Sequence, residues 1–74
     1  MPGVGTLVPK LARLRAVRDA QFMTQEELAE RSGIHQVTIS RIEQGDVEPR
    51  YRTIKRLAEA LGVEPNELVS EHTG

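Results

Sequence analysis

The sequence predicts an all-α domain of five short helices. Apolar residues recur at helical spacing along most of the 74 residues, aromatic residues make up only 3% of the chain, and runs of β-branched residues are rare. Glycine, proline and capping residues divide this pattern into short segments. A chain of this length holds one domain, expected at residues 7–70, with a flexible segment at 1–6 and a tail at 71–74.

The first helix is expected to run from Leu7 or Pro9 to Ala20. Proline is tolerated there because the first turn of a helix leaves its N–H groups without intrahelical partners. After the helix, Phe22 and Met23 form a short apolar link. The inner stripe of this helix consists of Leu7, Leu11, Leu14 and Val17.

The second and third helices are marked by their ends. Thr24 and Glu27 have the spacing of a capping box, in which each side chain bonds the backbone N–H of the other residue. Gly33 ends this second helix, since glycine readily adopts the left-handed conformation of a helix end. The third helix is expected to begin near His35 or Gln36 and to end at Gly45.

The fourth helix follows a loop at residues 46–49 and is expected to end at Gly62. A fifth, short helix is expected to begin near Pro65, which suits the first helical position, and to carry Leu68 and Val69. The amphipathic pattern of the fourth helix is formed by Tyr51, Ile54, Leu57, Ala58 and Leu61.

The second and third helices carry the functional signal. Two short helices joined by a glycine-containing turn predict a helix-turn-helix, whose second helix lies in the DNA major groove. The outer half of the third helix lacks acids and holds Gln36, Val37, Ser40, Arg41 and Gln44. Glutamine can pair with adenine, arginine with guanine, and valine can contact the thymine methyl group. The alternative is a helical hairpin in a small bundle with an ordinary polar face.

The charge balance argues against a nucleic-acid partner only when it is summed. Ten Lys and Arg face eleven Asp and Glu, which gives a net charge of −1. However, eight of the ten Lys and Arg residues lie in two stretches without acids, residues 10–18 and 50–56. Residues 59–71 contain four acids and no Lys or Arg. Because salt screens charges beyond ~8–10 Å, this local segregation matters more than the sum. Ordinary solvated helix faces remain the alternative.

Several function classes find no support in the sequence. The chain has no cysteine, so disulfides and thiolate metal sites are excluded. His35 and His72 are far apart and have no partner at metal-ligand spacing, and no phosphate loop or nucleophile motif is present. We therefore expect neither an enzyme nor a cofactor or metal. The absence of a secretory signal and of a long apolar run predicts a cytoplasmic protein.

The spacing of several short motifs resembles that of the Cro/CI-type (Xre) helix-turn-helix family. T-Q-E-E-L-A occupies residues 24–29, G-I follows at 33–34, I-S-R-I-E-Q-G at 39–45 and L-A-E-A-L-G-V at 57–63. The similarity extends from about Leu11 to Val69. It implies a lambda-repressor-like fold and a sequence-specific regulator of transcription that binds double-stranded DNA. We expect a repressor that binds a palindromic operator as a homodimer.

The resemblance also implies residue roles. Arg18 and Glu43 match a structural ion pair, and Leu68 lies with Val63 and Val69 in the region expected to form the dimer interface, although these residues could merely cap the core of a monomer. The positions implied to read bases are Gln36, Val37, Ser40 and Arg41. The positions implied to contact the DNA backbone are Thr24, Gln25, His35, Gln44 and Arg50.

Three residues depart from the family pattern. Val37 is an apolar residue on the side expected to face the groove, where the alternatives are a contact with a thymine methyl group and an inert filler. Phe22 stands where relatives usually have glycine or another small residue, and His35 stands where an N-capping Ser or Thr is more usual. The competing function is an antitoxin, a protein-binding module that also regulates its own operon. Such a protein usually needs a segment that folds on its partner, and only residues 1–6 and 70–74 are spare, which favours the regulator.

Overall fold

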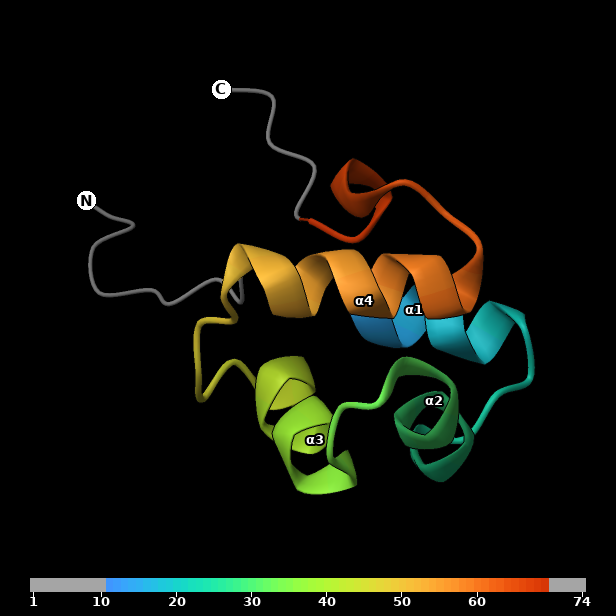
Figure 1. Cartoon of the computed structure of the whole chain (residues 1–74), viewed down its shortest axis with the longest axis horizontal. Coiled ribbons are helices and arrows are strands. Elements are labelled where there is room, and N and C mark those ends of the chain that lie inside the picture. The colour runs from blue at the N-terminus through green and yellow to red at the C-terminus, as the bar shows by residue number, and fades with distance from the viewer. Residues whose placement is uncertain (1–10, 70–74) are drawn as a thin grey trace.

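The computed structural model describes residues 11–69, which form four α-helices and one 3-10 turn without a strand in that range (Figure 1). α2 packs against both α3 and α4, and the 3-10 turn η1 packs against α4. The elements in chain order are α1 (Leu14–Ala20), α2 (Gln25–Ser32), α3 (Gln36–Gln44), α4 (Tyr51–Leu61) and η1 (Pro65–Glu67). The predicted all-α fold with a helix-turn-helix in the second and third helices is confirmed.

The core contains apolar side chains from every helix. Its fully buried members include Leu14 of α1, Leu28 of α2 and Ile39 of α3, each with no exposed area. Burying one such side chain contributes about 1.5–3 kcal/mol, so a few contacts across the core suffice to hold α2 and α3 against α4. The complete buried apolar cluster is Leu11, Leu14, Met23, Leu28, Ile39, Ile42, Ile54, Leu57, Ala58, Leu61 and Leu68.

The structure corrects the predicted fifth helix. Only a 3-10 turn forms at Pro65–Glu67, and Glu64 and Glu67 cap it reciprocally, the Glu64 N–H donating to Glu67 Oε2 at 2.9 Å. After this turn, the Leu68 carbonyl accepts a hydrogen bond from the Arg13 N–H at 3.1 Å. This long-range bond ties the end of the described chain to the beginning of α1.

The first helix begins later than expected within the described residues. Residues 11–13 form a turn, closed by the Leu14 N–H donating to the Leu11 carbonyl at 3.0 Å, and α1 starts at Leu14. The expected start at Leu7 or Pro9, the segment 1–6 and the tail 71–74 lie outside the described residues.

All four α-helices end in a residue with a left-handed backbone, but one of these residues is not glycine. At the end of α1, Phe22 has φ +55° and its side chain is 94% exposed. Its N–H donates to the Asp19 carbonyl and the Met23 N–H donates to the Arg18 carbonyl, the bond pattern of a Schellman motif. A left-handed residue other than glycine costs ~1–2 kcal/mol. The other three ends are Gly33, Gly45 and Gly62.

Candidate nucleic-acid interface

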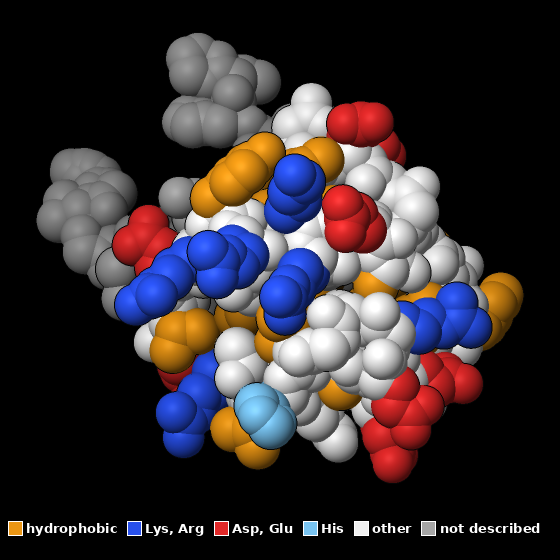
Figure 2. All heavy atoms as spheres, in the orientation of Figure 1, with side chains coloured by type: hydrophobic (Ala, Val, Ile, Leu, Met, Phe, Trp, Pro, Cys, Tyr) orange, Lys and Arg blue, Asp and Glu red, His pale blue; other side chains and the backbone are white. Residues whose placement is uncertain are grey.

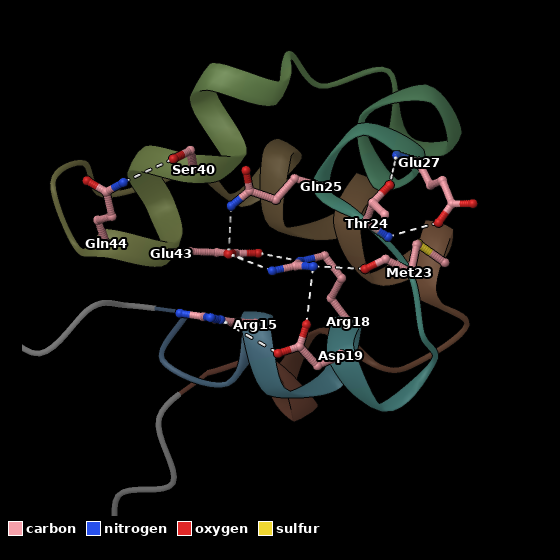
Figure 3. A network of polar contacts seen from close by, with 10 residues as sticks. All are labelled: Arg15, Arg18, Asp19, Met23, Thr24, Gln25, Glu27, Ser40, Glu43 and Gln44. Carbon is pink, nitrogen blue, oxygen red and sulfur yellow. Dashed lines mark hydrogen bonds and ion pairs between the residues drawn. The ribbon is translucent and has the colours of Figure 1, made fainter.

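The N-terminus of α2 is shaped by the predicted capping box. The Thr24 hydroxyl accepts from the Glu27 N–H at 3.0 Å, and the Thr24 N–H donates to Glu27 Oε1 at 2.8 Å (Figure 3). Among the described residues, the N–H groups of Gln25 and Glu26 have no such partner. These two donors lie at the positive end of the helix dipole, where anions bind favourably.

The turn between α2 and α3 is short. Gly33 ends α2 with φ +77°, and the Ile34 N–H donates to the Ser32 hydroxyl oxygen at 3.1 Å. His35 then precedes α3 with an extended backbone, and its side chain makes no capping hydrogen bond. The histidine at this position therefore gives α3 no side-chain cap, unlike the threonine before α2.

The outer side of α3 is exposed and free of acids. Ile39 and Ile42 bury the opposite side of the helix in the core. Val37 is 62% exposed although it is apolar, and Gln44 Nε2 donates to the Ser40 hydroxyl oxygen at 3.0 Å (Figure 3). We name the residues of this side the outer face: Gln36, Val37, Ser40, Arg41 and Gln44. The structure thus brings the four residues predicted to read bases onto one accessible surface, together with Gln44.

A buried polar network lies at the junction of α1, α2 and α3 (Figure 3). Arg18 Nε donates to Glu43 Oε2 at 2.7 Å and Arg18 Nη2 donates to Glu43 Oε1 at 3.0 Å, so the pair is bidentate. Gln25 Nε2 donates to the same Glu43 Oε1 at 2.9 Å. We call Arg18, Glu43 and Gln25 the buried network. It contains the predicted ion pair of Arg18 and Glu43. It also contains Gln25, for which the sequence predicted only a contact with the DNA backbone.

The ion pair in this network is enclosed, whereas Gln25 is half-buried. The side chains of Arg18 and Glu43 are 10% and 5% exposed, and Arg18 Nη1 donates to the Met23 carbonyl at 2.8 Å. The hydrogen bonds that Arg18 donates to Glu43 raise the pKa of Arg18 although burial opposes this, and the charges of Glu43 and Asp19 raise it further. Within the described residues, no buried side-chain nitrogen or oxygen lacks a hydrogen-bond partner. Arg18 therefore stays charged and holds Glu43 in a fixed position.

The other predicted contact residues lie at helix starts. Thr24 and His35 immediately precede α2 and α3, and Arg50 immediately precedes α4. All three are exposed. Arg50 is followed on the outer side of α4 by three exposed basic residues: Arg52, Lys55 and Arg56.

The surface charges are segregated as the sequence suggests. Figure 2 shows Lys and Arg side chains over the left and centre of the molecule, at the level of α4, whereas a group of Asp and Glu side chains lies over α2 at the lower right. The exposed acids of α2 are Glu26, Glu27 and Glu30. A net charge of −1 therefore conceals a distinctly basic side.

The expected dimer residues do not share one environment. Leu68 has no exposed area and belongs to the core, so its side chain offers no surface to a partner. Val63 and Val69 are half-buried against that core. Val63 also lines an open groove beside Tyr51, Lys55 and Pro65.

The described residues contain neither a membrane-spanning helix nor a metal-binding cluster. No helix in the described part of the chain is long and apolar enough to cross a membrane. Residues 11–69 contain no group of three or more His, Asp or Glu side chains that could hold a metal ion.

Comparison with known proteins identifies this arrangement. The family model described as helix-turn-helix, HTH_3, matches residues 14–68, which is most of the chain and includes all four α-helices. The chain belongs to the HTH_3 helix-turn-helix family. The predicted resemblance is confirmed, because the matched relatives are named HTH-type transcriptional regulators and a phage immunity repressor.

Individual HTH_3 relatives support this assignment. The HTH-type transcriptional regulator y4dL of Sinorhizobium fredii is 48% identical over 52 residues, which cover 70% of this chain but 26% of the relative. The chain thus spans about a quarter of that protein. The crystal structure of the restriction-modification controller protein C.AhdI from Aeromonas hydrophila is 39% identical with a TM-score of 0.78, covering 84% of this chain and 94% of that chain.

A second solved structure contains DNA. The P22 c2 repressor in complex with synthetic operator 9T is 31% identical with a TM-score of 0.71. The match covers 78% of this chain and 88% of the repressor chain.

Proposed function

We propose that this protein is a sequence-specific repressor that binds double-stranded DNA, reading a palindromic operator as a homodimer. The observation that carries the proposal is the outer face of α3, which is exposed, free of acids and rich in hydrogen-bonding side chains. A major groove about 12 Å wide admits one such helix, and carboxylates on the inserted face would repel the phosphates. The likeness to the P22 c2 repressor bound to its synthetic operator supports the same use of the fold.

The chemistry of the outer face assigns a role to each residue. Arg41 has the planar donor pair that recognises O6 and N7 of guanine, and Gln36 can donate to and accept from adenine. Val37, which is apolar and 62% exposed, suits contact with a thymine methyl group. The Ser40 hydroxyl oxygen already accepts from Gln44, so its proton is directed to an acceptor elsewhere.

Contacts to the DNA backbone fix the position of α3 in the groove. Thr24 and Gln25 at the start of α2, His35 at the start of α3 and Arg50 at the start of α4 suit phosphate binding, since helix N-termini favour anions. Gln44 lies one turn beyond Ser40, where it can reach the backbone at the edge of the groove. Such contacts contribute affinity and orientation but do not select a sequence.

One recognition helix covers few base pairs, so a second copy would supply the rest of the specificity. Helix-turn-helix dimers bind half-sites about one helical turn apart, ~34 Å or ~10 bp. The surface proposed for pairing comprises the exposed parts of Val63 and Val69 with the groove beside Tyr51, and Leu68 supports it from the core. The cytoplasmic location predicted from the sequence is consistent with a chromosomal target.

Selection of binding sites from random double-stranded DNA tests this function. The expected result is an enriched inverted repeat whose half-sites are centred about 10 bp apart. Sedimentation at micromolar concentration, with and without the selected DNA, then measures the number of copies bound. Enrichment of a single half-site by a monomer would contradict the dimer and leave DNA reading intact. Failure to enrich any sequence would contradict the proposed function itself.

A further inference from the structure

Gln25 is positioned by another side chain. We propose that Glu43 is a positioning residue that orients the Gln25 amide toward a DNA phosphate, and that Arg18 makes this possible by neutralising Glu43. The inference rests on the proposed function, because it assumes that Gln25 contacts a phosphate. It gives the buried network a role in binding in addition to its role in joining three helices.

The orientation follows from hydrogen-bond chemistry. A terminal amide can present either its oxygen or its NH₂ group, and a phosphate can only accept hydrogen bonds. The Glu43 carboxylate is likewise an acceptor, so it selects the orientation in which Gln25 Nε2 approaches it, at 2.9 Å. One N–H of Gln25 is used in this bond and the second remains for the phosphate. Without Glu43, the amide would be free to rotate its oxygen toward the DNA.

Arg18 solves an electrostatic problem. A bare carboxylate behind Gln25 would repel the phosphate that Gln25 binds. Arg18 forms a bidentate pair with Glu43 at 2.7 and 3.0 Å, and this places a compensating positive charge within the same enclosed site. Arg18 also lies 3.2 Å from Asp19, which in turn lies 3.6 Å from Arg15, so two arginines balance two carboxylates while Glu43 orients the amide.

Neighbouring donors complete the phosphate contact. The N–H groups of Gln25 and Glu26 lack partners among the described residues, because they lie in the first turn of α2 and the capping box satisfies only the Thr24 and Glu27 N–H groups. The Glu27 carboxylate is directed back to the Thr24 N–H by the same box. With the oriented Gln25 amide, these two backbone donors form a three-donor site at the beginning of α2.

A double-mutant cycle tests the coupling. Dissociation constants for the selected operator are measured by fluorescence anisotropy at several salt concentrations for wild type, Gln25→Ala, Glu43→Gln and the double variant. We expect each single change to weaken binding about 5- to 10-fold, the loss of about one ordinary hydrogen bond, and the double variant to bind no more weakly than Gln25→Ala. The base preference should not change, because phosphate contacts carry no sequence information.

A matched control separates positioning from stability. Gln21→Ala also truncates a glutamine whose Nε2 donates a hydrogen bond, to the Leu61 carbonyl at 2.7 Å, but this bond joins α1 to α4. Its folded form should bind the operator as tightly as wild type. Circular dichroism measured in parallel gives the folded fraction of each variant, so each dissociation constant refers to folded protein.

A second variant covers the case in which Glu43→Gln does not fold. Gln25→Asn keeps an amide but shortens it by one methylene, so it cannot reach both Glu43 and the phosphate. Positioning predicts that it binds within about twofold of Gln25→Ala, whereas wild-type affinity for Gln25→Asn would overturn the inference. Multiplicative losses in the cycle, or unchanged affinity in folded Glu43→Gln, would also overturn it. If wild type bound no DNA, the proposed function would fail first, and that outcome is separate.

Discussion

The two sides of α3 both carry polar residues, but these residues differ in burial. On the inner side, Glu43 is enclosed and takes part in three hydrogen bonds with Arg18 and Gln25. On the outer face, Gln44 and Ser40 share a single hydrogen bond, and Gln36 and Arg41 extend into solvent. Burial fixes geometry, so the inner side sets the angle between the helices. Exposure leaves side chains available, so the outer face can bind a ligand.

The energetic consequences of the two sides also differ. A buried ion pair loses much of its Coulomb attraction to desolvation, yet removal of one partner leaves an uncompensated charge and costs ~3–5 kcal/mol. An exposed hydrogen bond between neutral side chains contributes little, because water replaces either partner. Substitutions on the inner side should therefore change stability, with Glu43 also acting on binding through Gln25, and those on the outer face should change binding alone.

The largest expected effect is on the inner side. Arg18→Ala should lower the free energy of unfolding by ~3–5 kcal/mol, because Glu43 is left buried without its partner. Since a domain of this size is stabilised by only ~3–5 kcal/mol, much of the protein should be unfolded at 25 °C. Urea denaturation followed by circular dichroism measures the loss.

The matched control for this change is Arg15→Ala. Arg15 precedes Asp19 by one turn of the same helix, and Arg15 Nε lies 3.6 Å from Asp19 Oδ2. The Arg15 side chain is 73% exposed. Its removal should change stability by less than about 0.5 kcal/mol. Equal losses for Arg15→Ala and Arg18→Ala would contradict the assignment of the buried network as the structural junction.

A smaller effect of opposite sign is expected at Phe22. Phe22→Gly should raise the free energy of unfolding by about 1 kcal/mol, because glycine adopts the left-handed conformation without the clash that Phe22 suffers at φ +55°. The exposed phenyl ring contributes no core packing that could be lost. A rise in the urea midpoint without a change in slope would show this gain, and a lower midpoint would reveal a stabilising role of the ring.

The Phe22 variant also tests whether the residue that ends α1 affects the buried network or operator binding. Phe22 reverses the chain just before Met23, whose carbonyl accepts from Arg18 at 2.8 Å. Glycine preserves this turn, so the buried network and operator binding should both be unchanged. An altered operator affinity in Phe22→Gly would instead indicate that the ring takes part in binding.

Local signals in the sequence predicted the middle of the fold well. Thr24 with Glu27 and the glycines that end α2, α3 and α4 act through bonds between near neighbours, which spacing alone reveals. The predicted fifth helix forms only as the 3-10 turn Pro65–Glu67, and the Leu68 carbonyl after it pairs with Arg13, more than fifty residues away in the chain. No local pattern carries that information.

The same distinction applies to the candidate site. Helical periodicity placed Gln36, Ser40 and Arg41 on one side of a helix, and the structure shows Gln36 and Arg41 exposed there and Ser40 half-buried. By contrast, the hydrogen bond from Gln25 to Glu43 joins the beginning of one helix to the end of another. The burial of Leu68 likewise depends on packing that its apolar character alone did not distinguish from an exposed interface.

The base preferences of two arginine variants test whether the outer face of α3 reads DNA. Selection from random DNA is repeated with Arg41→Ala, on the outer face, and with Arg52→Ala, an exposed arginine of α4. Arg41→Ala should weaken binding to the wild-type operator by ~1–3 kcal/mol and lose preference at one base of each half-site, whereas Arg52→Ala should keep the wild-type profile. An unchanged profile for Arg41→Ala would contradict the reading of DNA by the outer face of α3.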